Sequence, residues 1–103
     1  MAMFLVVRGQ RGPDWDPSRS LEQQSGWAAH AAFMDDLVQR GNIVLGGPAG
    51  ERQAVLAFEA GSKDEVAELL AGDPWEGTHL ITSSVEEWEI RLDGRPRVGE
   101  SPA

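Results

Sequence analysis

One histidine lies where a helix is expected to be apolar. When residues 27–41 are placed on a helical wheel at about 100° per residue, His30 falls in the middle of the apolar arc, while Asp35 and Asp36 fall outside it. An imidazole that faces the core loses its hydration and needs a hydrogen-bond partner. His30 is therefore a candidate general base. The alternative is a core histidine whose ring nitrogens are satisfied by its neighbours.

A second candidate, Asp73, belongs to the sequence Gly72-Asp73-Pro74-Trp75. A residue before proline favours an extended conformation, so the carboxylate of Asp73 can turn back across the end of the preceding helix. A carboxylate that accepts an imidazole N–H fixes the tautomer and makes the other ring nitrogen more basic. His30 and Asp73 could thus form a general-base pair. The alternative is a purely structural aspartate, because Gly-Asp-Pro is a common turn that ends helices.

Four further residues are candidates for binding a small molecule. Arg8 follows an apolar strand and could hold a carboxylate of the substrate through two hydrogen bonds, although arginines at strand ends are commonly solvated. Trp15, Trp27 and Trp75 could form the walls of an aromatic pocket, although large aromatic side chains are first of all core residues. We expect a small-molecule ligand to bind beside His30.

Other chemistries find little support in the sequence. His79 is expected to be exposed and has no neighbouring cluster of ligands, so we predict no metal site. No helix start follows Gly46-Gly47-Pro48 to form a phosphate cradle. The chain has no cysteine and no Gly-x-Ser-x-Gly motif, and therefore no recognisable nucleophile for acyl transfer. We expect a protein that works without a cofactor.

Hydrophobic periodicity and turn residues predict the elements that must position these side chains. The expected elements begin with a strand at residues 3–7 and a helix at 25–41, with Ser25 as its N-cap. Strands at 43–45 and 54–58 follow, with a turn at 49–53, and then a helix with a capping box of Ser62 and Glu65. The last strand is expected at 78–92, where Trp88, Ile90 and Leu92 alternate with charged residues. This order predicts an α+β, ferredoxin-like βαββαβ fold, with a four-stranded antiparallel sheet carrying both helices on one face. Residues 1–92 would form the domain, and residues 93–103 a flexible C-terminal tail.

Two features of this plan predict further contacts. Residues 10–24 form a polar loop longer than the usual connection, and we expect it to act as a lid over a cleft, with Trp15 as its anchor. The first strand is apolar without alternation, so the sheet face turned away from the helices should be apolar too. A second copy of the chain is the most economical cover, and we therefore expect a homodimer through this open sheet face.

Charge and hydropathy narrow the range of partners. The chain of 103 residues has a formal net charge of -8, which opposes binding to nucleic acids and to anionic membranes. The apolar run at residues 3–7 is too short for a signal peptide or a membrane span. The absence of cysteine is compatible with a reducing compartment. We expect a cytoplasmic protein with no nucleic-acid or membrane partner.

Three segments resemble the YCII-related (YciI-like) family. They are the helix with His30, the sequence GNIVLGGP at residues 41–48, and Gly72-Asp73-Pro74-Trp75, and the resemblance extends over about residues 3–92. It implies a ferredoxin-like, dimeric α/β barrel in which the helix histidine and the aspartate of an Asp-Pro-Phe motif form the active-site pair. Those positions are His30 and Asp73 here, and Trp75 stands where phenylalanine is usual. The loop at residues 9–24 is longer than in the shortest members of the family.

Two classes of function remain open. In the first, His30, oriented by Asp73, moves a proton in an isomerisation or elimination on a small cyclic or aromatic substrate without a cofactor. The resemblance favours such a lyase or isomerase, because one related class dehydrochlorinates a hydroxylated aromatic ring and muconolactone isomerases share the barrel. In the second class, the protein is a non-catalytic small-molecule-binding or accessory module. The sequence leaves the substrate and the pathway open.

Overall fold

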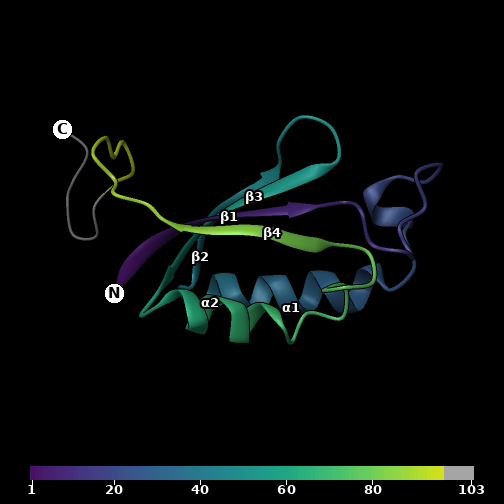
Figure 1. Ribbon diagram of the computed structural model, residues 1–103, viewed down its shortest axis with the longest axis horizontal. Helices are drawn as coiled ribbons and strands as arrows, with labels where there is room; N and C mark the ends of the chain where they lie inside the picture. The colour runs from purple at the N-terminus through teal and green to yellow at the C-terminus, as the bar shows by residue number, and fades with distance from the viewer. Residues whose placement is uncertain (97–103) are drawn as a thin grey trace.

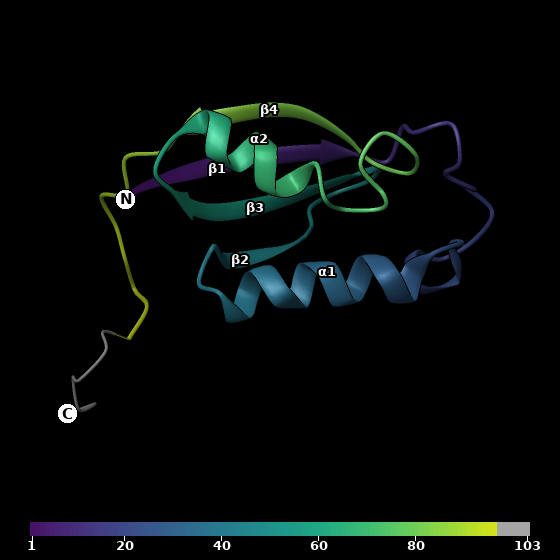
Figure 2. The same cartoon turned by 90° about the horizontal axis from the view of Figure 1, so that it is seen from below.

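Four strands and two α-helices form a two-layer α+β structure. In the computed structural model, which describes residues 1–96, the elements are β1 (Ala2–Gly9), the 3₁₀ helix η1 (Leu21–Gln23), α1 (Trp27–Gln39), β2 (Ile43–Pro48), β3 (Gln53–Ala60), α2 (Lys63–Leu70) and β4 (Ile81–Glu87). The sheet is antiparallel with the strand order β2-β3-β1-β4, and both helices lie on one of its faces (Figure 1, Figure 2). The predicted ferredoxin-like βαββαβ fold is confirmed.

The alternation of side chains along β1 creates the buried face of the sheet. Phe4 and Val6 are buried, and the register places them opposite Phe58 and Leu56 of β3. Arg8, the next residue in this row, is only 1% exposed. The core consists of Phe4, Val6, Leu37, Ile43, Leu56, Phe58, Ala60, Val66 and Leu70. Arg8 is therefore a charged side chain at one end of an apolar core.

The start of α1 differs from the sequence-based expectation. Gly26 is the N-cap, with φ of 74°, so the prediction of Ser25 as N-cap is wrong. Glycine adopts this left-handed conformation at little cost, and a Cβ at Gly26 would lie 3.3 Å from Nε1 of Trp75. The N-cap of α2 is the predicted Ser62, whose hydroxyl accepts the N–H of Glu65 at 3.1 Å. No helix within residues 1–96 is long and apolar enough to cross a membrane.

The strand boundaries correct two predictions. The strand predicted at residues 43–45 does not end before Gly46-Gly47-Pro48, because these residues belong to β2. β2 is an edge strand, where a proline removes no required ladder hydrogen bond. The last strand begins at Ile81 rather than residue 78, because the N–H groups of residues 78–80 instead donate to the carbonyl of Trp75.

The last strand also ends earlier than the period-two pattern predicts. β4 ends at Glu87, and Trp88 contributes one more hydrogen bond, from its N–H to the carbonyl of Met3 at 2.8 Å. The following residues, Trp88, Ile90 and Leu92 among them, border a hollow together with Met3, Leu45 and Ala57. The alternation over residues 88–92 therefore belongs to a segment beside the sheet and not to a strand within it. Of the predicted tail, residues 93–96 are exposed, and residues 97–103 lie outside the described residues.

The sheet face turned away from the helices is apolar along β1, as predicted, but the register also places Glu59, Glu86 and Ser84 on it, opposite Met3, Leu5 and Val7. It carries Met3, Leu5 and Val7 of β1, which alternate with the buried row, together with Leu45 of β2 and Ala57 of β3. Leu45 is 63% exposed. We call these five residues the open face.

The loop between β1 and α1 is fixed to the segment that precedes β4. The N–H of Gly12 donates to the carbonyl of His79 at 3.2 Å, and the N–H of Asp14 donates to the carbonyl of Thr78 at 2.7 Å. Inside the loop, the buried side chain of Gln24 donates to the carbonyls of residues 16, 19 and 20 and accepts the N–H of residue 16. The loop is thus held by hydrogen bonds at both of its halves.

Replacing Gly12 by alanine should destabilise the protein. A Cβ there would clash with the backbone carbonyl of Thr78, and relieving such a clash costs about 1–3 kcal/mol. Gly47→Ala is the matched control, because a Cβ at Gly47 meets no atom within 4 Å, and it should change the free energy of unfolding by less than about 0.5 kcal/mol. Urea denaturation measures both. Equal stabilities of the two variants would contradict the described packing of the loop.

Candidate active site

The carboxylate of Asp73 is fully buried and is contacted by three groups from different parts of the fold. Nδ1 of His30 lies 2.9 and 3.0 Å from its two oxygens. Nη2 of Arg8 lies 2.8 Å from Oδ2, and the backbone N–H of Trp75 donates to Oδ1 at 2.9 Å. The hydrogen bond predicted between His30 and Asp73 is therefore present, and Arg8 is a further partner.

These contacts determine the ionisation of Asp73. Burial alone raises the pKa of the Asp73 carboxyl, but hydrogen bonds from His30, from the N–H of Trp75 and from Arg8 outweigh burial and hold that pKa below its ordinary value. An ionised carboxylate only accepts hydrogen bonds, so Nδ1 of His30 must carry the proton. In a neutral imidazole, Nε2 then holds the free lone pair.

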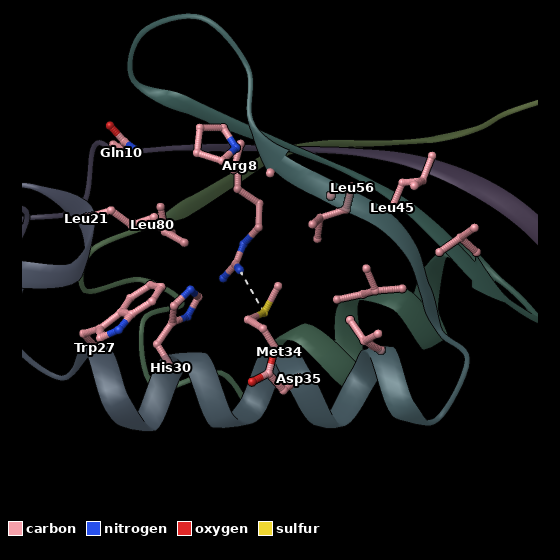
Figure 3. Close-up of a pocket in the computed structure, with 17 residues that line it drawn as sticks. Arg8, Gln10, Leu21, Trp27, His30, Met34, Asp35, Leu45, Leu56 and Leu80 are labelled. Carbon is pink, nitrogen blue, oxygen red and sulfur yellow. Dashed lines mark hydrogen bonds between the residues drawn. The ribbon is translucent and has the colours of Figure 1, made fainter.

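Nε2 of His30 is the ring nitrogen available to a ligand. It has no hydrogen-bond partner within residues 1–96. In that range, the one side-chain nitrogen or oxygen that is both fully buried and without a partner is Nε of Arg8, so Nε2 of His30 is not fully buried. Nε2 therefore keeps contact with solvent. His30 lines a cleft of about 330 Å³ between α1 and the β2 side of the sheet. Figure 3 shows His30, Trp27 and Met34 projecting from α1 toward Arg8 of β1.

The rest of this cleft is mostly apolar. Away from His30, its walls come from α1, β2 and β3 and include Met34, Val38, Ile43 and Leu56. Gln10 and Leu21, near the two ends of the long loop, also line it. The loop therefore borders the cleft, as the lid prediction requires, but Trp15 does not line it.

Arg8 is held inside the protein by two carboxylates. It lies 2.8 Å from Asp73 and 3.2 Å from Glu76, so the common solvated state of a strand-end arginine does not apply. Two opposite charges compensate its desolvation. Within residues 1–96, the one hydrogen-bond partner of Nη1 is Sδ of Met34, at 3.9 Å (Figure 3, dashed line), so Nη1 has no oxygen acceptor there and could donate to an oxygen of a ligand.

Glu76 is a site residue that the sequence analysis missed. Its carboxylate accepts hydrogen bonds from the backbone N–H and the hydroxyl of Thr82 as well as from Arg8. Its position three residues after Asp73 in the same turn was the available signal, because a turn at a helix end can direct two nearby carboxylates to one cation.

Trp75 supports the ring of His30 from behind. The indole is 1% exposed and stacks on His30 with centroids 4.1 Å apart and planes at 7°. His79 stacks on the indole at 4.7 Å, and the indole N–H donates to the carbonyl of Ser25 at 2.9 Å. Trp75 does not line the cleft, whereas Trp27, 5.8 Å from His30, does.

The prediction that His79 is exposed is wrong. The side chain is 5% exposed because it lies between Trp75 and the long loop. Nε2 of His79 is 3.0 Å from the hydroxyl of Ser25, and Nδ1 is 3.0 Å from that of Thr78. The ring of Trp15 packs edge-on against Trp75, with centroids 6.1 Å apart, so Trp15 ties the loop to Trp75, and the role of the loop as a lid stays a prediction.

The fold and this site define a ferredoxin-like α+β protein with a buried His–Asp–Arg cluster beside an apolar cleft. Within residues 1–96, no group of three or more His, Asp or Glu side chains is arranged to hold a metal ion. No protein-family model matches the chain, and a search of curated proteins finds no match. Membership of the YCII-related family stays a prediction.

The lowered pKa of Asp73 predicts a pH dependence of stability. As pH falls, the Asp73 carboxyl takes up a proton near its ordinary pKa of 3.8 in the unfolded chain, but only at a lower pH in the folded protein. The stabilisation by ionised Asp73 is therefore complete well above pH 3.8 and is lost as pH falls through the folded pKa. Asp73→Asn should reduce the free energy of unfolding at pH 7 by on the order of 1–3 kcal/mol, and the difference from the wild type should shrink in acid.

Chemical denaturation between pH 7 and pH 2 measures this difference. Asp36→Asn is the control, because the side chain of Asp36 is exposed and, among residues 1–96, pairs with Arg40 alone, at 3.2 Å. Exposed ion pairs contribute about 0–1 kcal/mol, so this variant should follow the wild type. A difference for Asp73→Asn that stays constant down to pH 2 would contradict the ionised carboxylate.

Proposed function

We propose that this protein is a small cofactor-independent enzyme, a lyase or isomerase, in which His30 and Asp73 act as a general-base pair. The observation that carries the proposal is the direction of the imidazole. Its Nδ1 is held by a buried carboxylate at 2.9 Å, while the unpartnered Nε2 belongs to a residue lining an apolar cleft. A base fixed in this way needs no reorientation before it accepts a proton.

The cleft favours a small cyclic or aromatic substrate with an acidic C–H group. Its volume of about 330 Å³ is at the lower end for small-molecule sites. Nε2 of His30 would take the proton from carbon, and the electron pair would either shift a double bond or expel a leaving group. In an isomerisation, the imidazolium returns the proton to another carbon atom. In an elimination, the proton passes to solvent.

Neighbouring side chains suit the charge that develops in such a step. Nη1 of Arg8 has only a sulfur acceptor at 3.9 Å, so it is free to donate to a substrate oxygen that becomes negative. Trp27 offers an aromatic wall beside His30. The resemblance to the YCII-related family supports the same pair of residues, because that family places its active-site histidine and aspartate at the positions of His30 and Asp73.

Hydrogen exchange from D₂O into candidate substrates tests the general base. The probes are unsaturated five-membered lactones and chlorinated hydroquinones, followed by NMR. The wild type should accelerate exchange or chloride release. His30→Gln should slow the reaction about 10²–10⁴-fold, and Asp73→Asn should slow it far more than it weakens binding. Wild-type rates in His30→Gln would end the proposal.

The alternative is a non-catalytic binding module, and one observation favours it. Every contact of Asp73 also joins structural elements, so the same cluster can serve the fold alone. In that case Asp73→Asn should lower the melting temperature while ligand affinity changes only a few-fold. No probe should then react faster with the wild type than in buffer, although a ligand would still bind in the cleft.

We further propose that the protein is a homodimer through the open face. Met3, Leu5 and Val7 present an apolar row there, and Leu45 is 63% exposed. Trp88, 41% exposed, borders the same surface. Antiparallel sheets with one face in water are usually polar on that face, and a two-fold axis would bury this patch on both copies at once.

Sedimentation equilibrium at micromolar concentration should give twice the chain mass of 11.2 kDa. Leu45→Glu should yield monomers, because dimerisation would then bury two unpaired charges. The matched control is Val38→Glu, which places the same charge on α1, at the border of the cleft and away from the open face, where Val38 is 52% exposed. A monomeric wild type, or a dimer unaffected by Leu45→Glu, would contradict this interface.

A further inference from the structure

A second hollow beside the cleft gathers positive charge. It has a volume of about 660 Å³, and its lining includes Arg11, Arg19, Arg52 and Trp15. The whole chain has nine lysines and arginines and a net charge of -8. Three arginines around one hollow therefore give this region a positive charge, opposite in sign to the net charge of the molecule.

Two of these guanidinium groups have no counter-charge. The side chains of Arg11 and Arg52 make no ion pair or hydrogen bond within residues 1–96, whereas Arg19 lies 3.4 Å from Asp16. Glu51 is the acidic residue lining the hollow, and it forms no ion pair with them. Within residues 1–96, the hollow thus has an excess of positive charge that no carboxylate pairs with.

The backbone holds the two unpaired arginines together. The N–H of Gln10 donates to the carbonyl of Arg52 at 2.8 Å, which joins the end of β1 to the β2–β3 turn. Arg52 has φ of 66°, and it is the only residue other than glycine with positive φ in the described part of the chain. Glycine or asparagine would adopt this conformation more easily. An arginine in this position is consistent with a function for its side chain.

The hollow and the cleft are continuous in their lining. Gln10 and Leu21 line both, and Arg8 inside the cleft is already neutralised by Asp73 and Glu76. Guanidinium groups bind carboxylates and phosphates through paired hydrogen bonds. We propose that Arg11 and Arg52 bind the oxyanion group of the small molecule whose apolar part occupies the cleft. This inference rests on the proposed function and specifies its substrate class as an acidic small molecule.

Three probes with the same ring and different head groups test the inference by titration calorimetry. They are phenylacetate, phenyl phosphate and the uncharged benzyl alcohol. The wild type should bind at least one acid about tenfold or more tightly than benzyl alcohol, and added salt should reduce that preference. Tighter binding of phenyl phosphate identifies a phosphate ligand, and tighter binding of phenylacetate identifies a carboxylate.

The double variant Arg11→Gln/Arg52→Asn should lose the preference for the acids. Asparagine suits the positive φ at position 52, so the turn should be retained, which circular dichroism and the melting temperature check. Arg40→Gln removes one exposed arginine that pairs with Asp36, and it should keep the preference. Equal binding of the alcohol and the acids, no binding of any probe, or a preference that survives in the double variant would overturn the inference.

His30→Gln separates this inference from the proposed function. The variant should keep the preference for the acidic probes, because His30 does not line the arginine-rich hollow. If His30→Gln binds the acids like the wild type and the wild type catalyses no proton transfer, the anion site stands and the general-base function fails. If proton transfer depends on His30 but the acids show no advantage, the enzyme stands and the anion site fails.

Discussion

The structure depends on how one buried carboxylate is neutralised. Asp73 has no contact with solvent, and it is bound by Arg8 of β1, His30 of α1 and the backbone of the turn that follows α2. An unpaired buried carboxylate would be strongly destabilising. Its three partners therefore bring the sheet and both helical segments to a single point. On the buried face of β1, the core residues Phe4 and Val6 are followed by Arg8, so the polar cluster begins where the apolar core ends.

The same constraint organises the site. Because Asp73 accepts from Nδ1, the tautomer of His30 is fixed, and because Trp75 stacks on the ring at 4.1 Å, its rotation is restricted. Trp75 is in turn held by the carbonyl of Ser25 and by the ring of His79. The side chain proposed to react is thus positioned by neighbours whose own orientations are fixed, as a preorganised site requires.

The fold and part of this cluster could be predicted because they follow from local patterns. The apolar arc of α1 identified His30 as a buried polar residue, and the Gly-Asp-Pro turn directed attention to Asp73. The burial of Arg8 and its ion pair with Glu76 could not be predicted from local patterns, because both depend on β1 and the turn after α2 becoming neighbours in space. His79 is buried for a similar reason, since the distant loop that starts after β1 covers it.

Two errors in the element boundaries also have physical causes. Ser25 has the side chain of a typical N-cap, but the chain needs a left-handed residue next to the indole of Trp75, and Gly26 meets that need. The alternation of Trp88, Ile90 and Leu92 is a true period of two. A period of two marks an extended segment with one apolar side, and it does not specify that the segment pairs within the sheet.

Charge balance explains why an arginine and two carboxylates suit a base in this position. With a neutral imidazole, Arg8, Asp73 and Glu76 together carry one net negative charge, because two carboxylates face one guanidinium. When His30 accepts a proton in the proposed reaction, the cluster becomes neutral. The site therefore stabilises the imidazolium through charges that are already in place. Arg8 alone with Asp73 would give a neutral cluster before the transfer and a positive one after it. Glu76, which pairs with Arg8 and makes no hydrogen bond or ion pair with His30 within residues 1–96, thus makes the proposed proton transfer electrostatically more favourable.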